Sequence, residues 1–236
     1  PDVAPFLTDA IPHEHQHAVL QSAKLAEKLA GDIPADSLTL RYPVVEADRS
    51  WVNGYLNEWG INNSGRLFVI HPGAGTWVKR WDDPKWASVA DVLSDQLDAT
   101  VVFTGGDHEL AMVRRIISSM KHRACVMVGD TGIGSLAALY ERALVVIGAD
   151  SGPMHLAAAV ATPTVALFGP ADPAEFRQWG SPDKHMILTS SMGCRPCRIL
   201  DWHSDDPANH PCVREITVGS VLEAARRVVD AERNPL

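Results

Sequence analysis

Short apolar runs alternate with longer amphipathic segments along most of the chain. Each run is rich in Val, Ile and Leu and ends at a polar or glycine-bearing turn, which is typical of strands buried on both faces of a sheet. The intervening segments have apolar residues at helical spacing. This alternation predicts an α/β fold, a parallel sheet of about six strands with helices on both faces. The predicted strands are 67–71, 100–104, 124–128, 144–149, 164–168 and 186–189, and the predicted helices are 15–30, 50–59, 85–97, 108–120, 135–142, 153–160, 173–178 and 218–231.

The first 64 residues follow a different pattern. Residues 15–30 form an amphipathic helix that Gly31 can terminate. Residues 32–46 contain two prolines and the alternating stretch LTLRYPVV, which predicts a linker followed by an edge segment. We therefore expect residues 1–64 to be the tail of a preceding domain with its linker, and residues 65–236 to be the α/β domain.

Composition and charge narrow the class of protein. The chain has 236 residues, of which 46% are hydrophobic and 21% charged, and a formal net charge of -8. This is a globular balance, and the acidic net charge argues against a nucleic-acid partner. No apolar stretch approaches the roughly 20 residues that span a bilayer, and the opening PDVAPFLTDA does not resemble a signal peptide. Because the chain opens without Met, we expect it to be a fragment.

Polar, glycine-bearing motifs follow the first five predicted strands. In chain order they read HPGAGT, TGGDHE, GDTGIG, DSG and GPADP. Ligands of open parallel sheets bind beyond the carboxyl ends of the strands. We therefore expect the five loops to line one crevice at that edge.

The fourth loop has the strongest chemical signal. Asp150, Ser151 and Gly152 stand between a buried strand and a helix, and the first N–H groups of a helix form a ready anion site. The alternative is that Asp150 or Ser151 only caps the helix. His155, one turn further on, is placed to bind phosphate or sugar, although a single helix histidine is more often structural.

The first two loops add ligand-binding side chains. In HPGAGTWVKRW, Gly73 and Gly75 permit close backbone approach, Thr76 offers a hydroxyl and Lys79 a charge suited to phosphate. A solvated surface lysine is the alternative.

The TGGDHE loop offers backbone N–H groups and a carboxylate. Thr104 and Gly105 supply the N–H groups, and Glu109 suits ribose hydroxyls. A surface Glu that favours its helix N-terminus is the alternative. The chain has no GxxxxGK[ST] loop and no catalytic triad spacing, which argues against an ordinary ATPase or a triad hydrolase.

A cysteine cluster stands near the end of the chain. Cys194, Cys197 and Cys212, with His203 and His210 nearby, have ligand types suited to a structural zinc. A labile disulfide or buried thiols are alternatives. An odd number of clustered cysteines, in a chain with no visible secretory signal, argues for a reducing compartment.

Five motifs of this chain, taken in order, resemble those of glycosyltransferase family 9, which includes the ADP-heptose:lipopolysaccharide heptosyltransferases. The motifs are HPGAG with KRW, TGG with a downstream acid, DSGPMHLAAA, PTVALFGPADP and CRPC. The resemblance covers about residues 66–230, and a weaker match begins near Phe6. It implies a GT-B enzyme with two Rossmann-like domains. The C-terminal domain binds the nucleotide-sugar donor, and the N-terminal domain binds the acceptor and supplies the base. This chain resembles the donor domain.

The resemblance also implies roles for residues. The transfer is inverting and needs no divalent metal, so Lys79 neutralises the leaving diphosphate and Asp150 lies beside the transferred sugar. Many family members carry a further cysteine after CxxC where this chain has Asp201-Trp202-His203, so a zinc site would need His203 as a ligand. The other implied donor-binding residues are Gly75, Thr76, Thr104, Gly105, Glu109, Ile133, Ser151, Gly152 and His155.

The implied setting is bacterial lipopolysaccharide biosynthesis. The donor is ADP-heptose, the acceptor is the lipopolysaccharide core, and the enzyme is cytoplasmic, peripheral at the inner membrane through its first domain. The fragment alone is expected to bind nucleotide without turnover. A nucleotide-sugar epimerase of similar fold and a non-catalytic nucleotide-binding module are the alternatives, because the fold confers none of these functions by itself.

Overall fold

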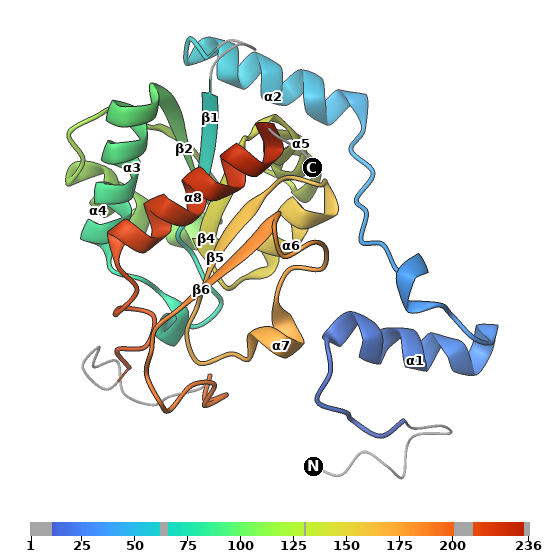
Figure 1. Cartoon of the computed structure of the whole chain (residues 1–236). Helices are drawn as coiled ribbons and strands as arrows, with labels where there is room; N and C mark the ends of the chain where they lie inside the picture. Colours follow the sequence, from blue (N-terminus) through green and yellow to red (C-terminus); the bar gives the residue numbers. More distant parts are fainter. Residues whose placement is uncertain (1–10, 62–65, 130, 201–209, 234–236) are drawn as a thin grey trace.

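The computed structural model describes residues 11–61, 66–129, 131–200 and 210–233. Six parallel strands form one sheet in the order β3-β2-β1-β4-β5-β6 (Figure 1). The order reverses between β1 and β4, which makes this a doubly wound sheet with its switch point there. All six predicted strands are confirmed, as β1 (Arg66–His71), β2 (Ala99–Gly105), β3 (Cys125–Val128), β4 (Val145–Ala149), β5 (Thr164–Phe168) and β6 (His185–Thr189).

The predicted helices are also present, with shifted ends. The largest shift is at the helix predicted over 50–59, which begins at Glu46. At 108–120, a 3₁₀ turn precedes an α-helix that ends at Ser118. Of the helices in the described residues, none pairs the length with the apolarity that crossing a bilayer requires. The helices are α1 (Ala18–Ala30), η2 (Ala35–Ser37), α2 (Glu46–Glu58), η3 (Trp77–Lys79), α3 (Asp83–Leu97), η4 (Asp107–Glu109), α4 (Leu110–Ser118), α5 (Ile133–Arg142), α6 (Gly152–Ala159), α7 (Pro173–Phe176) and α8 (Val218–Arg233).

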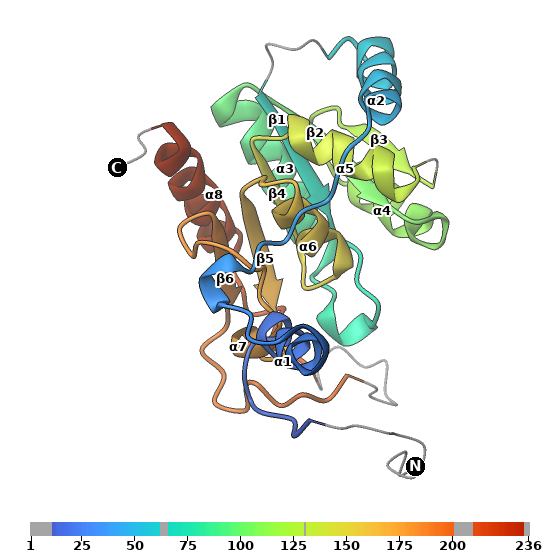
Figure 2. The same ribbon diagram turned by 90° about the vertical axis from the view of Figure 1, so that its right-hand side faces the viewer.

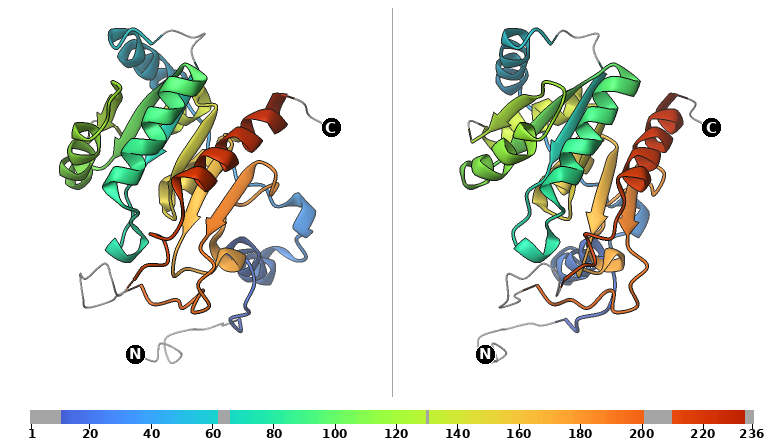
Figure 3. Two further views of the ribbon diagram at one scale, coloured as in Figure 1. Left: turned by 60° about the vertical axis from the view of Figure 1, so that its left-hand side comes forward. Right: turned by 90° about the vertical axis from the view of Figure 1, so that its left-hand side faces the viewer.

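Two hydrophobic cores lie on opposite faces of the sheet. Helices α3, α4 and α8 cover one face (Figure 3), and α2, α5 and α6 cover the other (Figure 2). Along β1, Phe68 and Ile70 belong to the first core, whereas Leu67 and Val69 belong to the second. Each strand thus buries side chains on both faces, which is why the strands read as unbroken apolar runs.

The N-terminal segment runs along the outside of this body. Helix α1 lies beside α7 (Figures 1 and 2), where His17 Nε2 lies 2.8 Å from the Arg177 carbonyl oxygen. The edge segment predicted before α2 is wrong, because residues 38–45 form no strand. They cross helix α6 rather than a sheet edge and make a single backbone bond there, from Tyr42 N–H to Ala159 O at 3.0 Å. Pro43 has no N–H with which to continue a ladder.

Helix α2 is anchored to the sheet body. Val52 and Leu56 are fully buried in the second core. Arg49 pairs with Glu141 of α5 at 2.7 Å, and the Tyr55 hydroxyl donates to the Val126 carbonyl oxygen at 2.6 Å. The burial of two large side chains makes α2 part of the folded unit that carries β1 to β6.

Candidate nucleotide-sugar site

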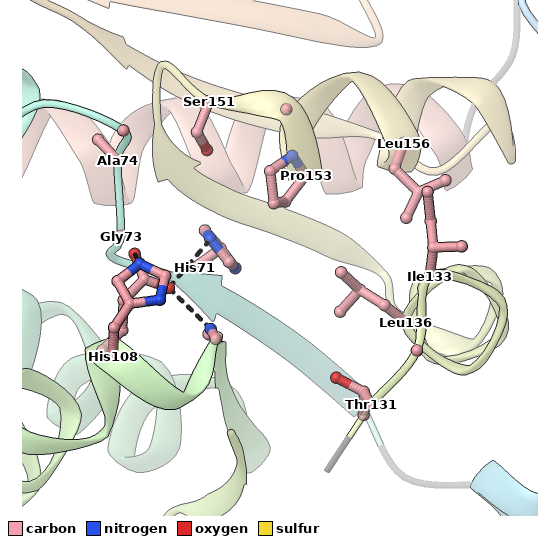
Figure 4. Close-up of a pocket in the computed structure, with 16 residues that line it drawn as sticks. His71, Gly73, Ala74, His108, Thr131, Ile133, Leu136, Ser151, Pro153 and Leu156 are labelled. Atoms are coloured by element: carbon pink, nitrogen blue, oxygen red, sulfur yellow. Dashed lines mark hydrogen bonds and ion pairs between the residues drawn. The ribbon is translucent and has the colours of Figure 1, made fainter. Parts of the chain in front are cut away.

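A cavity of about 590 Å³ opens at the carboxyl ends of β1, β2 and β4 (Figure 4). It lies at the switch point between β1 and β4, where open α/β sheets bind ligands. Ser151 and Pro153 lie across the cavity from His71, and three apolar side chains gather at the far end (Figure 4). Those apolar side chains are Ile133, Leu136 and Leu156.

Four of the five predicted loops line this cavity, and the fifth does not. The GPADP loop turns away because Asp172 is held elsewhere. Its carboxylate accepts from Ala174 N–H at 2.9 Å, at the start of α7, and from Arg198 Nη2 at 2.7 Å. The expectation of five loops around one crevice was therefore wrong by one loop.

The N-terminus of α6 faces the cavity without a side-chain cap. Ser151 is the N-cap residue, but its hydroxyl donates to Ala149 O at 3.1 Å and makes no cap bond. Gly152 and Pro153 begin the helix, and proline has no N–H. The capping alternative is therefore not what the structure has. Met154 N–H already donates to Ser151 O at 3.1 Å, so Gly152 N–H, at the positive end of the helix, is the first-turn donor left for an anion.

Lys79 is not a solvated surface lysine. Its Nζ lies 2.7 Å from Asp150 Oδ2, and the two side chains are 18% and 5% exposed. Lys79 ends η3, and Asp150 follows β4. The pair brings the loops after β1 and β4 together, and Asp150 directly precedes the N-cap of α6. Neither residue lines the cavity, so the pair stands beside it.

His155 lies on the face of α6 turned toward this pair. Burial lowers the pKa of its imidazole, the nearby Asp150 carboxylate raises it, and His17 and Lys79 lower it. His155 does not line the cavity.

Glu109 is buried and lines the cavity. Its Oε2 accepts from Gly106 N–H at 2.9 Å. A Cβ on Gly73 would lie 1.8 Å from Glu109 Oε1, and one on Gly105 would lie 2.9 Å from Oε2. Gly73 thus makes room for a carboxylate of the protein itself, whereas the sequence had suggested close approach to a ligand. The surface-Glu alternative does not hold either.

His71 is a site residue that the sequence interpretation missed. Its Nδ1 lies 3.0 Å from Thr104 Oγ1, and its Nε2 lies 3.9 Å from Glu109 Oε2. Burial lowers the pKa of His71 to about 4, against a raising effect of Glu109 and a smaller lowering effect of His108. The imidazole is therefore neutral at pH 7. The signal available in the sequence was a histidine that ends a buried apolar run.

The remaining predicted residues divide into two groups. Gly75, Gly105 and Ile133 line the cavity. Thr104 is fully buried beneath it, where it contacts His71. Thr76 Oγ1 is also buried and has no hydrogen-bond partner among the described residues.

The predicted zinc ligands are only partly described. Cys194, Cys197 and Cys212 carry free thiols, and burial is the main cause that raises the pKa of Cys212. Within the described ranges, their sulfur atoms do not all lie within 4.8 Å of one another, and His203 lies outside those ranges. The zinc site stays a prediction that metal analysis of the purified chain can test.

Known glycosyltransferases are similar to this chain in sequence. The model of glycosyltransferase family 9 (heptosyltransferase) matches residues 2–201. Lipopolysaccharide heptosyltransferase 3 of Escherichia coli is 30% identical over 176 residues, which are 74% of this chain and 51% of that protein. The chain thus spans about half the length of this relative.

Two solved structures share the fold. A glycosyl transferase family 9 protein from Veillonella parvula has a TM-score of 0.81 at 24% identity and covers 96% of this chain and 64% of its own. E. coli ADP-heptose lps heptosyltransferase II has a TM-score of 0.70 at 23% identity, with 87% and 58% covered. Because the family model matches most of its length, the chain belongs to glycosyltransferase family 9.

Proposed function

We propose that this chain is the donor-binding half of a heptosyltransferase, in which the cavity between β1 and β4 binds ADP-heptose. The observation that carries the proposal is the Lys79–Asp150 pair, 2.7 Å apart beside the uncapped N-terminus of α6. A cation beside a helix N-terminus at one end of a cavity suits a diphosphate. The names of the E. coli relatives, which include ADP-heptose and lipopolysaccharide, support the choice of donor and acceptor.

Each part of the donor has a matching part of the cavity. The apolar end with Ile133, Leu136 and Leu156 suits the adenine base. The buried Glu109 carboxylate can accept hydrogen bonds from both ribose hydroxyls. The diphosphate lies at the α6 N-terminus, within reach of Lys79, with Thr76 Oγ1 as a further donor.

The proposed reaction is an inverting transfer. The acceptor hydroxyl oxygen forms a bond to the anomeric carbon of heptose while the bond from that carbon to the diphosphate oxygen breaks. The hydroxyl proton passes to a base on the acceptor-binding half. Lys79 and the helix N-terminus stabilise the negative charge that develops on the leaving ADP. Protein groups alone supply this charge stabilisation, so the transfer is proposed to need no divalent metal.

The sequence predicted a boundary at residue 64/65, but Val52 and Leu56 of α2 are buried in the second core of the sheet body. The proposed donor domain therefore begins with α2 at Glu46, and the residues before α2 contain the linker from an acceptor-binding domain. The acceptor is the lipopolysaccharide core, so the whole enzyme works in the cytoplasm at the inner membrane face, and the acceptor-binding domain makes the peripheral contact.

Calorimetric titration with ADP, UDP and GDP tests the proposal. ADP should bind preferentially, and Lys79→Ala should weaken its binding about 10- to 100-fold, because a charge-assisted hydrogen bond contributes roughly 1.5–3 kcal/mol. Lys121→Ala, an exposed lysine at the opposite end of the sheet, is the matched control. Equal ADP affinity for the Lys79 variant and wild type would overturn the assigned role.

Two other results would favour the alternatives. Interconversion of free nucleotide sugars by the whole protein, without any acceptor, would favour an epimerase. Nucleotide binding without transfer, even by the whole protein with its acceptor, would favour a non-catalytic binding module.

A further inference from the structure

A second cavity, of about 510 Å³, is lined by η3, the start of α3, helix α4 and the segment that leads into α8. Three arginines and two aspartates line it, with Trp77 in its wall. These charged residues are Arg80, Arg115, Arg214, Asp82 and Asp83. None of them belongs to the donor cavity.

The charges in this second cavity do not balance. Asp83 Oδ2 pairs with Arg115 Nε at 2.9 Å, and Asp82 Oδ1 lies 3.6 Å from Arg214 Nε. Asp82 is further shared with Lys85 at 3.2 Å. Arg80 has no acidic partner in the described part of the chain, and its Nε is buried without a hydrogen-bond partner. A guanidinium left in this state favours an anion that it can bind through two N–H groups.

The wall of the cavity favours a sugar over a bare ion. Trp77 is half-buried and lies edge-on to His210, with ring centroids 5.2 Å apart. Trp81 is buried, and its indole N–H donates to Ile216 O at 3.0 Å. The Trp77 ring therefore offers apolar surface beside the arginines, and the Trp81 ring, only 2% exposed, packs behind the cavity wall. Arg80 directly follows Lys79, so η3 ends at the proposed donor diphosphate and at this cavity.

We propose that the second cavity binds the phosphate group of a phosphorylated saccharide, with Arg80 as the main anion-binding residue. The binding itself is independent of the donor site. The further identification of this saccharide as part of the acceptor rests on the proposed function.

Titration of the chain with glucose 6-phosphate, glucose and inorganic phosphate tests this site. Glucose 6-phosphate should bind, glucose should not, and inorganic phosphate should bind at least about tenfold more weakly than the sugar phosphate. Arg80→Gln should weaken glucose 6-phosphate binding at least about tenfold. Arg80→Lys, which keeps the charge but not the planar fork, should give an intermediate loss. Arg123→Gln, which removes an exposed charge at the opposite end of the sheet, should match wild type.

Repeating the titrations in Lys79→Ala separates this site from the donor site. Arg80-dependent binding should be unchanged there, so a failure of ADP binding would leave this proposal standing. Equal glucose 6-phosphate affinity in wild type and Arg80→Gln would overturn it, as would no binding by wild type. Inorganic phosphate binding as tightly as the sugar phosphate would overturn the saccharide assignment. Circular dichroism establishes whether the Arg80 variants are folded. If Arg80→Gln does not fold, Arg80→Lys still tests the site.

Discussion

At the scale of single residues, the side chains of the candidate site contact one another and so fix one another's positions. The Glu109 carboxylate fills the space that a side chain at position 73 would take, and it accepts from Gly106 N–H. His71 lies between Glu109 and Thr104. The orientation of the carboxylate proposed to bind ribose therefore depends on a glycine and a neutral histidine that touch it.

Gly73→Ala should displace Glu109. Its Cβ would lie 1.8 Å from Oε1, so the carboxylate must move. We expect a loss of roughly 1–3 kcal/mol in unfolding free energy, as for other overpacked sites, and at least about tenfold weaker ADP binding by calorimetry. Gly54→Ala is the control, since nothing lies within 4 Å of its Cβ. Unchanged ADP affinity in Gly73→Ala would show that Glu109 does not bind the nucleotide.

His71 should make the protein less stable in acid. Its pKa is about 4 in the folded chain and near 6.5 when unfolded. Between those values the unfolded chain binds more protons, so the unfolding free energy falls as the pH falls. Urea unfolding at pH 7 and pH 5 should give a difference of which His71 accounts for roughly 2 kcal/mol.

Replacement of His71 by Gln should remove that part of the acid loss. The dependence of the unfolding free energy on pH that remains includes a contribution from His185, because burial also lowers the pKa of His185 to about 4. His122→Gln is the control, because His122 is exposed and is not among the groups that shift the pKa of His71. The same acid loss in His71→Gln and wild type would contradict the assignment.

At the scale of elements, the sequence predicted strands well because each strand is apolar on both faces. Helix ends were less exact, as at Glu109, where the chain passes from a 3₁₀ turn to an α-helix. The linker before α2 misled the prediction, since its alternation of apolar residues reflects partial packing of Tyr42 and Val44 on the second core rather than strand pairing.

The candidate site was predictable where ligand-binding groups follow strands. Lys79, Asp150 and Glu109 stand in such loops. His71 and the role of Gly73 were not, because they depend on a contact between residues 71–73 and residue 109 that only the β1–β2 pairing brings about. Local spacing carries no record of that pairing.

Helix α2 should behave as part of the core despite its distance in sequence from β4 to β6. Leu56 is fully buried, so Leu56→Ala should cost about 2–5 kcal/mol in unfolding free energy. Leu29→Ala in α1 is the matched control, because Leu29 is 94% exposed and its loss should stay within about 0.5 kcal/mol. Chemical denaturation measures both. Equal costs would mean that α2 does not share the cooperative unit.

At the scale of the whole molecule, the chain corresponds to about half of its E. coli relative. We therefore predict that it binds nucleotide but does not transfer sugar by itself, because acceptor binding and the base are assigned to the other half. Release of ADP from ADP-heptose in the presence of a lipopolysaccharide core acceptor measures this. Acceptor-dependent ADP release by the chain alone would contradict the assignment of acceptor binding and the base to the other half.

The most direct test is the position of ADP in a crystal structure of its complex with this chain. We predict that adenine lies against Ile133, that the ribose hydroxyls lie within hydrogen-bond distance of Glu109, and that the diphosphate lies at the Gly152 end of α6 beside Lys79. ADP bound elsewhere, or with its diphosphate away from α6, would contradict it.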